Sequence, residues 1–263
     1  MQRPDTFTID PHHHLANGLV FAGLGANAGS GHYHDSSLYG LHGSLTGATL
    51  PTWKSVQSVV GIDVSLGGYA STPGCTIGSQ YTISWLHSWT TSAASRDVVL
   101  SGTGGTALTN EIAIRHISAS YRTFYHYGDS DGASTITFAS AGAIFTGDRR
   151  CSLVSRVGAD YDVYVDGTVR TDSESFSTDK MSLADGLHIG VDADTSTYGF
   201  NGVIADVLVH NRVLSDSEIQ QIADPSNVML SGLIQLPARK WFAVASTPAA
   251  SQVFPILSSS IIR

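Results

Sequence analysis

Apolar and polar residues alternate along most of this chain in short segments, and turn-forming residues separate those segments. A period of two predicts strands whose side chains point to opposite faces of a sheet. Strands are predicted at residues 18–24, 56–70 (one or two strands), 80–90, 97–101, 111–117, 121–127, 134–145 (one or two), 152–169 (a hairpin), and within 187–210. Many short strands with turn signals between them indicate an antiparallel β-sandwich.

The stretch 187–222 gives the strongest local signals, and it predicts a strand, a loop, a long strand and one short helix. In the long strand, 202–210, strict alternation places four apolar side chains on one face and a mixed set on the other. The apolar face would carry Val203, Ala205, Val207 and Val209, and the mixed face Ile204, Asp206, Leu208 and His210. Such a strand suits the centre of a sheet that packs on a second sheet.

A capping box, Ser215-Asp-Ser-Glu218, predicts the start of the helix, because serine and glutamate can each bond the other's backbone N–H. Ile219 and Ile222 would face the core, and Asp224-Pro225 would end the helix.

Two turns are also predicted from local chemistry. Asp166-Gly167 has the composition of a type I′ hairpin turn. In the Gly- and His-rich loop 25–43, Asp35 and Ser36 can bond the backbone two residues on, and Gly40 and Gly43 allow positive φ.

The segment Gly202-x-Ile-x-Asp-Val-x-Val-His-Asn-Arg-x-Leu-Ser-Asp-x-Glu-Ile219 resembles the closing signature of LamG-like domains in the concanavalin A-like lectin/glucanase superfamily. The loop 34–43, the strand at 80–90 and the Tyr164-Val-Asp-Gly167 hairpin are similar to further family features. The resemblance implies an all-β, antiparallel two-sheet jelly-roll sandwich over 18–224 with one short C-terminal helix. An N-terminal arm (1–17) and a C-terminal extension (225–263) would flank it.

The composition limits the kinds of partner that this protein can bind. A net charge of −8 disfavours a nucleic-acid backbone, and no apolar run is long enough for a membrane span. We also expect no signal peptide, because the first residues, Met-Gln-Arg-Pro-Asp-Thr, are not followed by an apolar core. Cys75 and Cys151 could form a disulfide or be two buried apolar side chains.

The glucanase branch of the superfamily uses paired carboxylates on one strand face, and retaining hydrolysis needs them about 5 Å apart. The strand glutamate is Glu111, whose partner positions hold Ala113 and Arg115, while Glu174 lies in a polar loop. We therefore expect that the glucanase dyad is absent and that the protein is not an enzyme. There is no glycine-flanked nucleophile elbow for a Ser-His-Asp site.

Other side chains could bind ligands, and each set has a structural alternative. Calcium could be held by oxygen-rich loops at Asp129 and Asp131 and at Asp192 and Asp194; the alternative is that these residues are ordinary turn formers. A transition metal could be held by histidines that would otherwise be solvated: His12, His13, His14, His32, His34 and His42. Candidate sugar-binding aromatics, which could instead pack in the core or rim, are Trp89, Tyr125, Tyr127 and Tyr198.

The extension has no charged residue between Lys240 and Arg263, so its aromatic residues need cover, from the sandwich or from another protein. Trp241, Phe242 and Phe254 are the candidate docking residues. Asp224-Pro225 followed by Pro237–Phe242 resembles extensions in bacteriophage virion proteins.

The leading hypothesis is a virion structural or interaction protein that displays a lectin-like sandwich. Its partners would be other virion proteins or copies of itself, with surface glycans as a further partner. The alternative is a free, extracellular carbohydrate-binding module. A third hypothesis is a glycoside-processing enzyme, which the missing dyad argues against.

Overall fold

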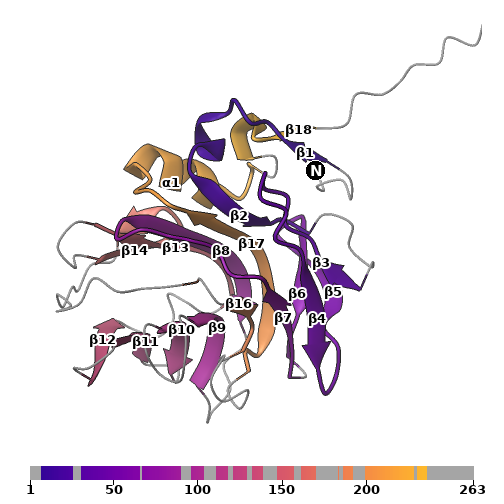
Figure 1. Ribbon diagram of the computed structural model, residues 1–263, viewed down its shortest axis with the longest axis vertical. Helices are drawn as coiled ribbons and strands as arrows, with labels where there is room; N and C mark the ends of the chain where they lie inside the picture. Colours follow the sequence, from indigo (N-terminus) through magenta and orange to yellow (C-terminus); the bar gives the residue numbers. More distant parts are fainter. Residues whose placement is uncertain are drawn as a thin grey trace, which may run out of the picture.

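Two large antiparallel sheets packed face to face form the sandwich of the computed structural model (Figure 1). The structure describes residues 7–25, 31–65, 67–89, 96–103, 111–117, 121–128, 132–138, 147–156, 161–169, 183, 186–191, 199–227 and 230–235. In β10, β11 and β12 it describes the backbone alone.

The first sheet has β17 at its centre, hydrogen-bonded to β8, β6 and β2. Its order is β15 (Thr168–Val169), β14 (Tyr161–Val165), β13 (Gly147–Ser155), β8 (Tyr81–Trp89), β17 (Gly202–His210), β6 (Val59–Asp63) and β5 (Thr52–Val56), with β2 (Leu19–Gly23) also on β17.

The second sheet contains the predicted meander. Its order is β12 (Gly132–Phe138), β11 (Tyr121–Gly128), β10 (Glu111–Ile117), β9 (Arg96–Thr103), β16 (Gly186–Ile189), β7 (Gly68–Thr72), β4 (Gly43–Gly47) and β3 (His32–Tyr33). The all-β jelly-roll prediction and the position of β17 in mid-sheet are confirmed.

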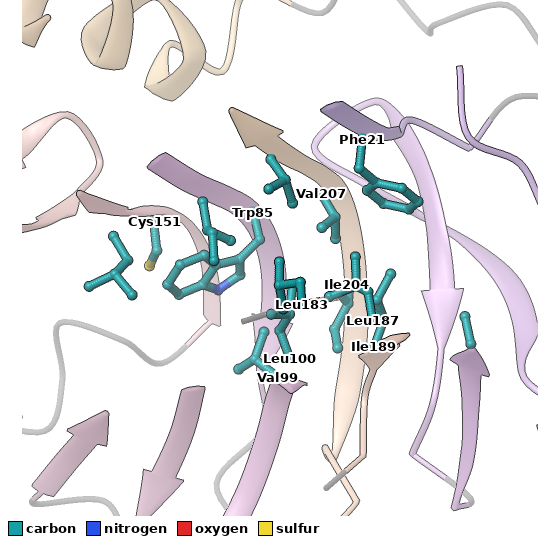
Figure 2. Packing of buried hydrophobic residues seen from close by; sticks show 14 of the residues in the cluster. Phe21, Trp85, Val99, Leu100, Cys151, Leu183, Leu187, Ile189, Ile204 and Val207 are labelled. Atoms are coloured by element: carbon teal, nitrogen blue, oxygen red, sulfur yellow. The ribbon is translucent and has the colours of Figure 1, made fainter. Parts of the chain in front are cut away.

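Between the sheets lies the main apolar core. Figure 2 shows Trp85, Phe21 and Val207 pointing from the first sheet toward residues of the second, among them Leu100 and Leu187. Trp85 is 1% exposed and continues the inward row of β8 that begins with Tyr81 and Ile83. Removing these side chains from water is the main force that holds the two sheets together.

A second apolar cluster covers the outer face of the first sheet, where helix α1 (Asp216–Ala223) lies (Figure 1). The predicted capping box is present, since the Glu218 N–H donates to Ser215 Oγ and the Ser215 N–H donates to a Glu218 carboxylate oxygen. Ile219 and Ile222 are buried as predicted.

Residues that flank the predicted sandwich also enter this second cluster. Leu15, in the 3₁₀ helix η1 (His14–Ala16), is fully buried, and so are Leu230 and Leu233 around η3 (Leu230–Gly232). β1 (Thr8–Ile9) pairs with β18 (Ile234–Gln235) as a separate two-stranded sheet. The flanks therefore hold each other against the sandwich over the residues described.

The strict alternation predicted for β17 is wrong beyond Ala205, because the strand contains a β-bulge. Ala205 pairs with Leu86 and Leu208 with Ser84, so β17 has one extra residue there, and Asp206 takes a left-handed φ of 48°. Val207 and Val209 consequently join Ile204 in the main core, while Val203 and Ala205 pack in a separate cluster.

The bulge places the Asp206 carboxylate against Arg150 of β13. Arg150 Nη1 lies 3.1 Å from Asp206 Oδ2, and the two side chains are 3% and 1% exposed. The same nitrogen donates to the carbonyl of Ile222 at 3.2 Å, and Arg150 Nε donates to Gln57 at 3.3 Å. One guanidinium thus joins β17, the helix end and the β5–β6 turn.

Other local predictions have mixed outcomes. Asp166 and Gly167 both have positive φ, 50° and 75°, which confirms the hairpin turn. Gly40 has a φ of 62° as predicted, but Gly43 does not need positive φ. A Cβ on Gly43 would instead lie 2.4 Å from the carbonyl oxygen of Ser71, so close packing requires the glycine. Cys75 and Cys151 are both buried thiols, which agrees with the second alternative. No helix in the described part is long and apolar enough to cross a membrane.

Asp206→Ala should lower the free energy of unfolding by about 3–5 kcal/mol. It leaves a buried guanidinium without its carboxylate, and alanine tolerates the positive φ of this position less well than aspartate does. Urea unfolding measures the change. Lys54→Ala, which breaks an exposed pair with Asp63, is the control and should cost less than about 1 kcal/mol. Equal effects of the two variants would contradict this account of the bulge.

Candidate functional site

A buried carboxylate organises the loop between β3 and β4. Asp35 is 3% exposed, and its carboxylate accepts four hydrogen bonds. Three come from backbone N–H groups of Ala22, Ser37 and Leu41, each at 2.8 Å, and the fourth from the Ser37 hydroxyl at 2.7 Å. The bond from the Ser37 N–H is the predicted Asx turn, the bond from Leu41 joins the two ends of the loop, and the bond from Ala22 ties the loop to β2.

Further hydrogen bonds fix the rest of the loop backbone. The Ser36 N–H donates to the carbonyl of Ala22, and the Tyr39 N–H donates to the Ser37 hydroxyl. The His42 N–H bonds back to Gly40, which closes a tight turn with the glycine at positive φ. The backbone of residues 35–42 is therefore fixed by bonds within the loop and to β2.

The loop 35–42 exposes two large side chains to solvent. Leu38 is 76% exposed and Tyr39 is 63% exposed, the two highest values among the large apolar residues of the described chain. We call these two residues the Leu38–Tyr39 ridge. A rigid loop that exposes an aromatic ring is a typical binding surface, because the loop backbone does not have to become ordered when a ligand binds.

A pocket of about 300 Å³ opens beside the Tyr39 side of the ridge. It is lined by Val20, Tyr39, Leu41, Gly74, Cys75, Thr76 and Asn211, none of which is charged. We call it the Tyr39 pocket. Its volume corresponds to that of about ten liquid water molecules, which is enough room for one monosaccharide.

The chemistry of the Tyr39 pocket is mixed. The tyrosine ring and Leu41 provide apolar surface, while the exposed Thr76 hydroxyl and Asn211 amide provide donors and acceptors. Apolar walls with a few polar groups are the usual lining of a small-molecule site. Sugar rings match such a lining, because they carry an apolar face and a rim of hydroxyls.

At the base of the pocket, burial raises the pKa of the Cys75 thiol to about 12, and the charge of Asp35 adds to this effect. The thiol therefore stays protonated at neutral pH and is a poor nucleophile. Its role in the pocket is packing.

Three of the six histidines considered as metal ligands, His32, His34 and His42, lie close together at this loop. The rings of His34 and His42 have centroids 5.1 Å apart, and those of His32 and His34 are 6.4 Å apart. Burial lowers the pKa of His34, and the neighbouring histidines lower it further. Within the described residues, no three His, Cys, Asp or Glu side chains are placed to hold a metal ion.

A larger cleft of about 550 Å³ lies near the end of α1, between Asp166-Gly167 and Asp224-Pro225. An ion pair of 2.8 Å between Arg149 and Asp166 lies within it. Its described lining contains charged and amide side chains and no aromatic ring. The Tyr39 pocket is therefore the better candidate for a sugar, although it is smaller.

A family model described as the concanavalin A-like lectin/glucanases superfamily matches residues 65–220, more than half of the chain. The chain belongs to this superfamily. No curated protein sequence matches closely enough to serve as a relative.

Solved structures with the same fold include domain 4 of AbnA, a GH43 extracellular arabinanase from Geobacillus stearothermophilus, in complex with arabinotriose. It has a TM-score of 0.59 and 16% identity, and the match covers 78% of this chain and 100% of that domain. The binding domain of Paraclostridial Mosquitocidal Protein 1 has a TM-score of 0.60 and 12% identity, with 81% and 53% coverage.

A structure of botulinum neurotoxin type C, whose cell entry depends on two ganglioside molecules, has a TM-score of 0.56 and 12% identity, with 83% and 52% coverage. This lectin-like chain spans about half the length of the toxin domains. At such low identity these likenesses describe the fold.

The structure places the predicted site residues away from the Tyr39 pocket or outside its described part. Trp89 is 2% exposed and lies in the main core, so its ring is not open to a ligand. Tyr125 and Tyr127 lie in β11, where the backbone alone is described. The remaining candidates fall outside the described residues: Tyr198, Asp129, Asp131, Asp192, Asp194, Trp241, Phe242 and Phe254.

Of the glutamates considered for catalysis, Glu218 is the one whose side chain the structure describes. Glu218 accepts hydrogen bonds from Arg212 at 2.7 and 3.1 Å, and these bonds lower its pKa to about 2. It is therefore ionised at neutral pH and cannot donate a proton to a leaving group. Glu111 lies in β10, and Glu174 is outside the described residues.

Asp35→Asn should lower the free energy of unfolding by at least about 2 kcal/mol, because the amide has one acceptor oxygen and turns an N–H₂ group toward backbone donors. Urea unfolding gives the stability, and hydrogen exchange of residues 36–41 reports the loop. Asp63→Asn is a matched control: Asp63 makes the same turn bonds to Ser65 but is more exposed, so it should cost less than about 1 kcal/mol. Unchanged exchange in the loop would show that Asp35 does not hold it.

Proposed function

We propose that this protein is a non-enzymatic carbohydrate-binding protein, and that its lectin-like sandwich holds a neutral sugar in the Tyr39 pocket. The observation that carries the proposal is the exposed Tyr39 ring on a loop fixed by Asp35, beside an uncharged pocket with an amide and a hydroxyl. The ring would stack on the apolar face of the sugar, while Asn211 and Thr76 would bond its hydroxyls.

The comparisons support a binding role. One neighbour holds arabinotriose, and another enters cells through gangliosides. The uncharged lining favours a neutral sugar over an anionic one in this chain, since no cationic side chain among the described residues lines the Tyr39 pocket.

The non-enzymatic part of the proposal rests on the side chains that could take part in catalysis. The Cys75 thiol of the pocket is protonated at neutral pH and is therefore a poor nucleophile. Glu218 is held as an anion by Arg212 and therefore cannot serve as the proton donor.

Tyr39→Ala should weaken binding of the best neutral glycan from an array by about tenfold or more, because it removes the stacking surface. Isothermal titration calorimetry measures the affinity. Tyr39→Phe keeps the ring and should retain most of the affinity, and Val169→Ala, at a distant exposed position, should change nothing. Equal affinities of Tyr39→Ala and the native protein would place the sugar elsewhere.

We further propose that the sandwich is displayed on a virion, with the C-terminal extension as its attachment. The support is the resemblance of Asp224-Pro225 and Pro237–Phe242 to extensions of bacteriophage virion proteins. The extracellular, freely diffusing module remains the alternative.

Truncation after Gln235 tests this attachment. The cut keeps Leu233 and Ile234, which are buried, so the sandwich should stay folded. Light scattering should show an oligomer for the full chain and a monomer for the truncated chain, with equal glycan affinities. A monomeric full chain would contradict the proposed display on a virion and would favour the freely diffusing module.

A further inference from the structure

A second hollow, of about 310 Å³, lies on the Leu38 side of the ridge. Phe7 and Thr8 of the N-terminal segment line it on one side, and the loop residues His34, Ser36, Leu38 and His42 on the other. We call it the Phe7 hollow. The proposed binding of a sugar in the Tyr39 pocket does not involve this hollow.

The lining of the Phe7 hollow resembles that of the Tyr39 pocket in kind. Phe7 and Leu38 provide apolar surface, and Thr8 and Ser36 carry hydroxyls. His34 and His42 add ring nitrogens that can donate or accept. Asp35 also borders the hollow, but its carboxylate already accepts four hydrogen bonds.

The two cavities are lined by neighbouring residues of one loop. Leu38 lines the Phe7 hollow and Tyr39 lines the Tyr39 pocket, and these are consecutive residues whose Cα atoms are about 3.8 Å apart. Both side chains stand out from the surface, and the Asp35 hydrogen bonds fix the backbone beneath them. A chain of sugar rings that lies over these two side chains would therefore border both cavities.

We infer that the Tyr39 pocket and the Phe7 hollow are two subsites of one site, which binds a neutral oligosaccharide of at least three units across the Leu38–Tyr39 ridge. One ring occupies each cavity, and the ring between them lies over the ridge. This inference rests on the proposed sugar-binding role of the Tyr39 pocket and specifies its ligand as a chain rather than a single terminal sugar.

The second subsite also gives a role to the N-terminal segment. Phe7 and Thr8 are held in place because β1 pairs with β18, and Gln235 Nε2 donates to Asp10 at 2.7 Å. The Asp10 N–H donates to the carbonyl of Leu233 at 2.8 Å. Two segments far apart in sequence thus build one wall of the site.

The test titrates the full chain with two neutral series, arabino-oligosaccharides and gluco-oligosaccharides, from the monosaccharide to the pentasaccharide. The affinity for the series that binds should rise at least tenfold between the disaccharide and the trisaccharide, because the second cavity is then reached. It should level off once both cavities are filled.

Thr8→Arg is the decisive variant. Thr8 is exposed, so the larger side chain enters the hollow without disturbing the core. It should reduce the trisaccharide affinity to that of the disaccharide and leave the monosaccharide affinity unchanged. Thr168→Arg is the matched control: it makes the same substitution at an exposed strand position that lines neither cavity, and it should leave both affinities unchanged.

The outcomes separate the two proposals. An affinity that is independent of chain length and of Thr8→Arg overturns the second subsite, while the Tyr39 pocket stands if Tyr39→Ala still weakens binding at least about tenfold. An affinity that Tyr39→Ala leaves unchanged, or no binding of either series, overturns both.

Discussion

Four hydrogen-bond donors surround the buried carboxylate of Asp35, and the surface proposed to bind ligand depends on them. A buried carboxylate is costly unless its oxygens are satisfied, so the backbone N–H groups of Ala22, Ser37 and Leu41 must stay in place. The same bonds that satisfy the charge therefore fix the loop. Leu38 and Tyr39 project from a rigid base, which lets two exposed apolar residues act as a defined ridge.

The sandwich supplies what that loop is attached to. Ala22 belongs to β2, which pairs with β17 at the centre of the first sheet, and the loop leads into β4 of the second sheet. Both anchors are thus strands of the sandwich. On the outer side, the packing of Leu15, Leu230 and Leu233 brings β1 and β18 beside the same loop, and this places Phe7 next to the ridge. Core packing and site geometry follow from the same strand order.

Local signals in the sequence predicted the elements well. The Ser215 capping box, the Asp166-Gly167 turn and the Asp35 turn each depend on residues within a few positions of one another, and all three are present. Alternation also places Trp89 on the same face as Tyr81, Ile83 and Trp85, so its burial follows from the pattern even though its ring was a candidate for sugar binding. Tyr39 carries no such signal, because its exposure depends on how the loop is tied to β2. The pairing of β1 with β18 joins residues at opposite ends of the chain, and no short-range pattern encodes it.

The bulge at Asp206 affects how relatives of this protein can be compared. One extra residue reverses the assignment of inward and outward positions for the rest of β17, so a residue-by-residue alignment with an unbulged strand would match core positions to outward ones. At identities of 10–16%, a shift of that kind cannot be detected from sequence similarity alone. The left-handed acidic residue, and the arginine of β13 that pairs with it, are therefore useful alignment markers: a homologue that has both should be aligned to β17 without a gap, and one that lacks both should be aligned with a one-residue gap at the bulge.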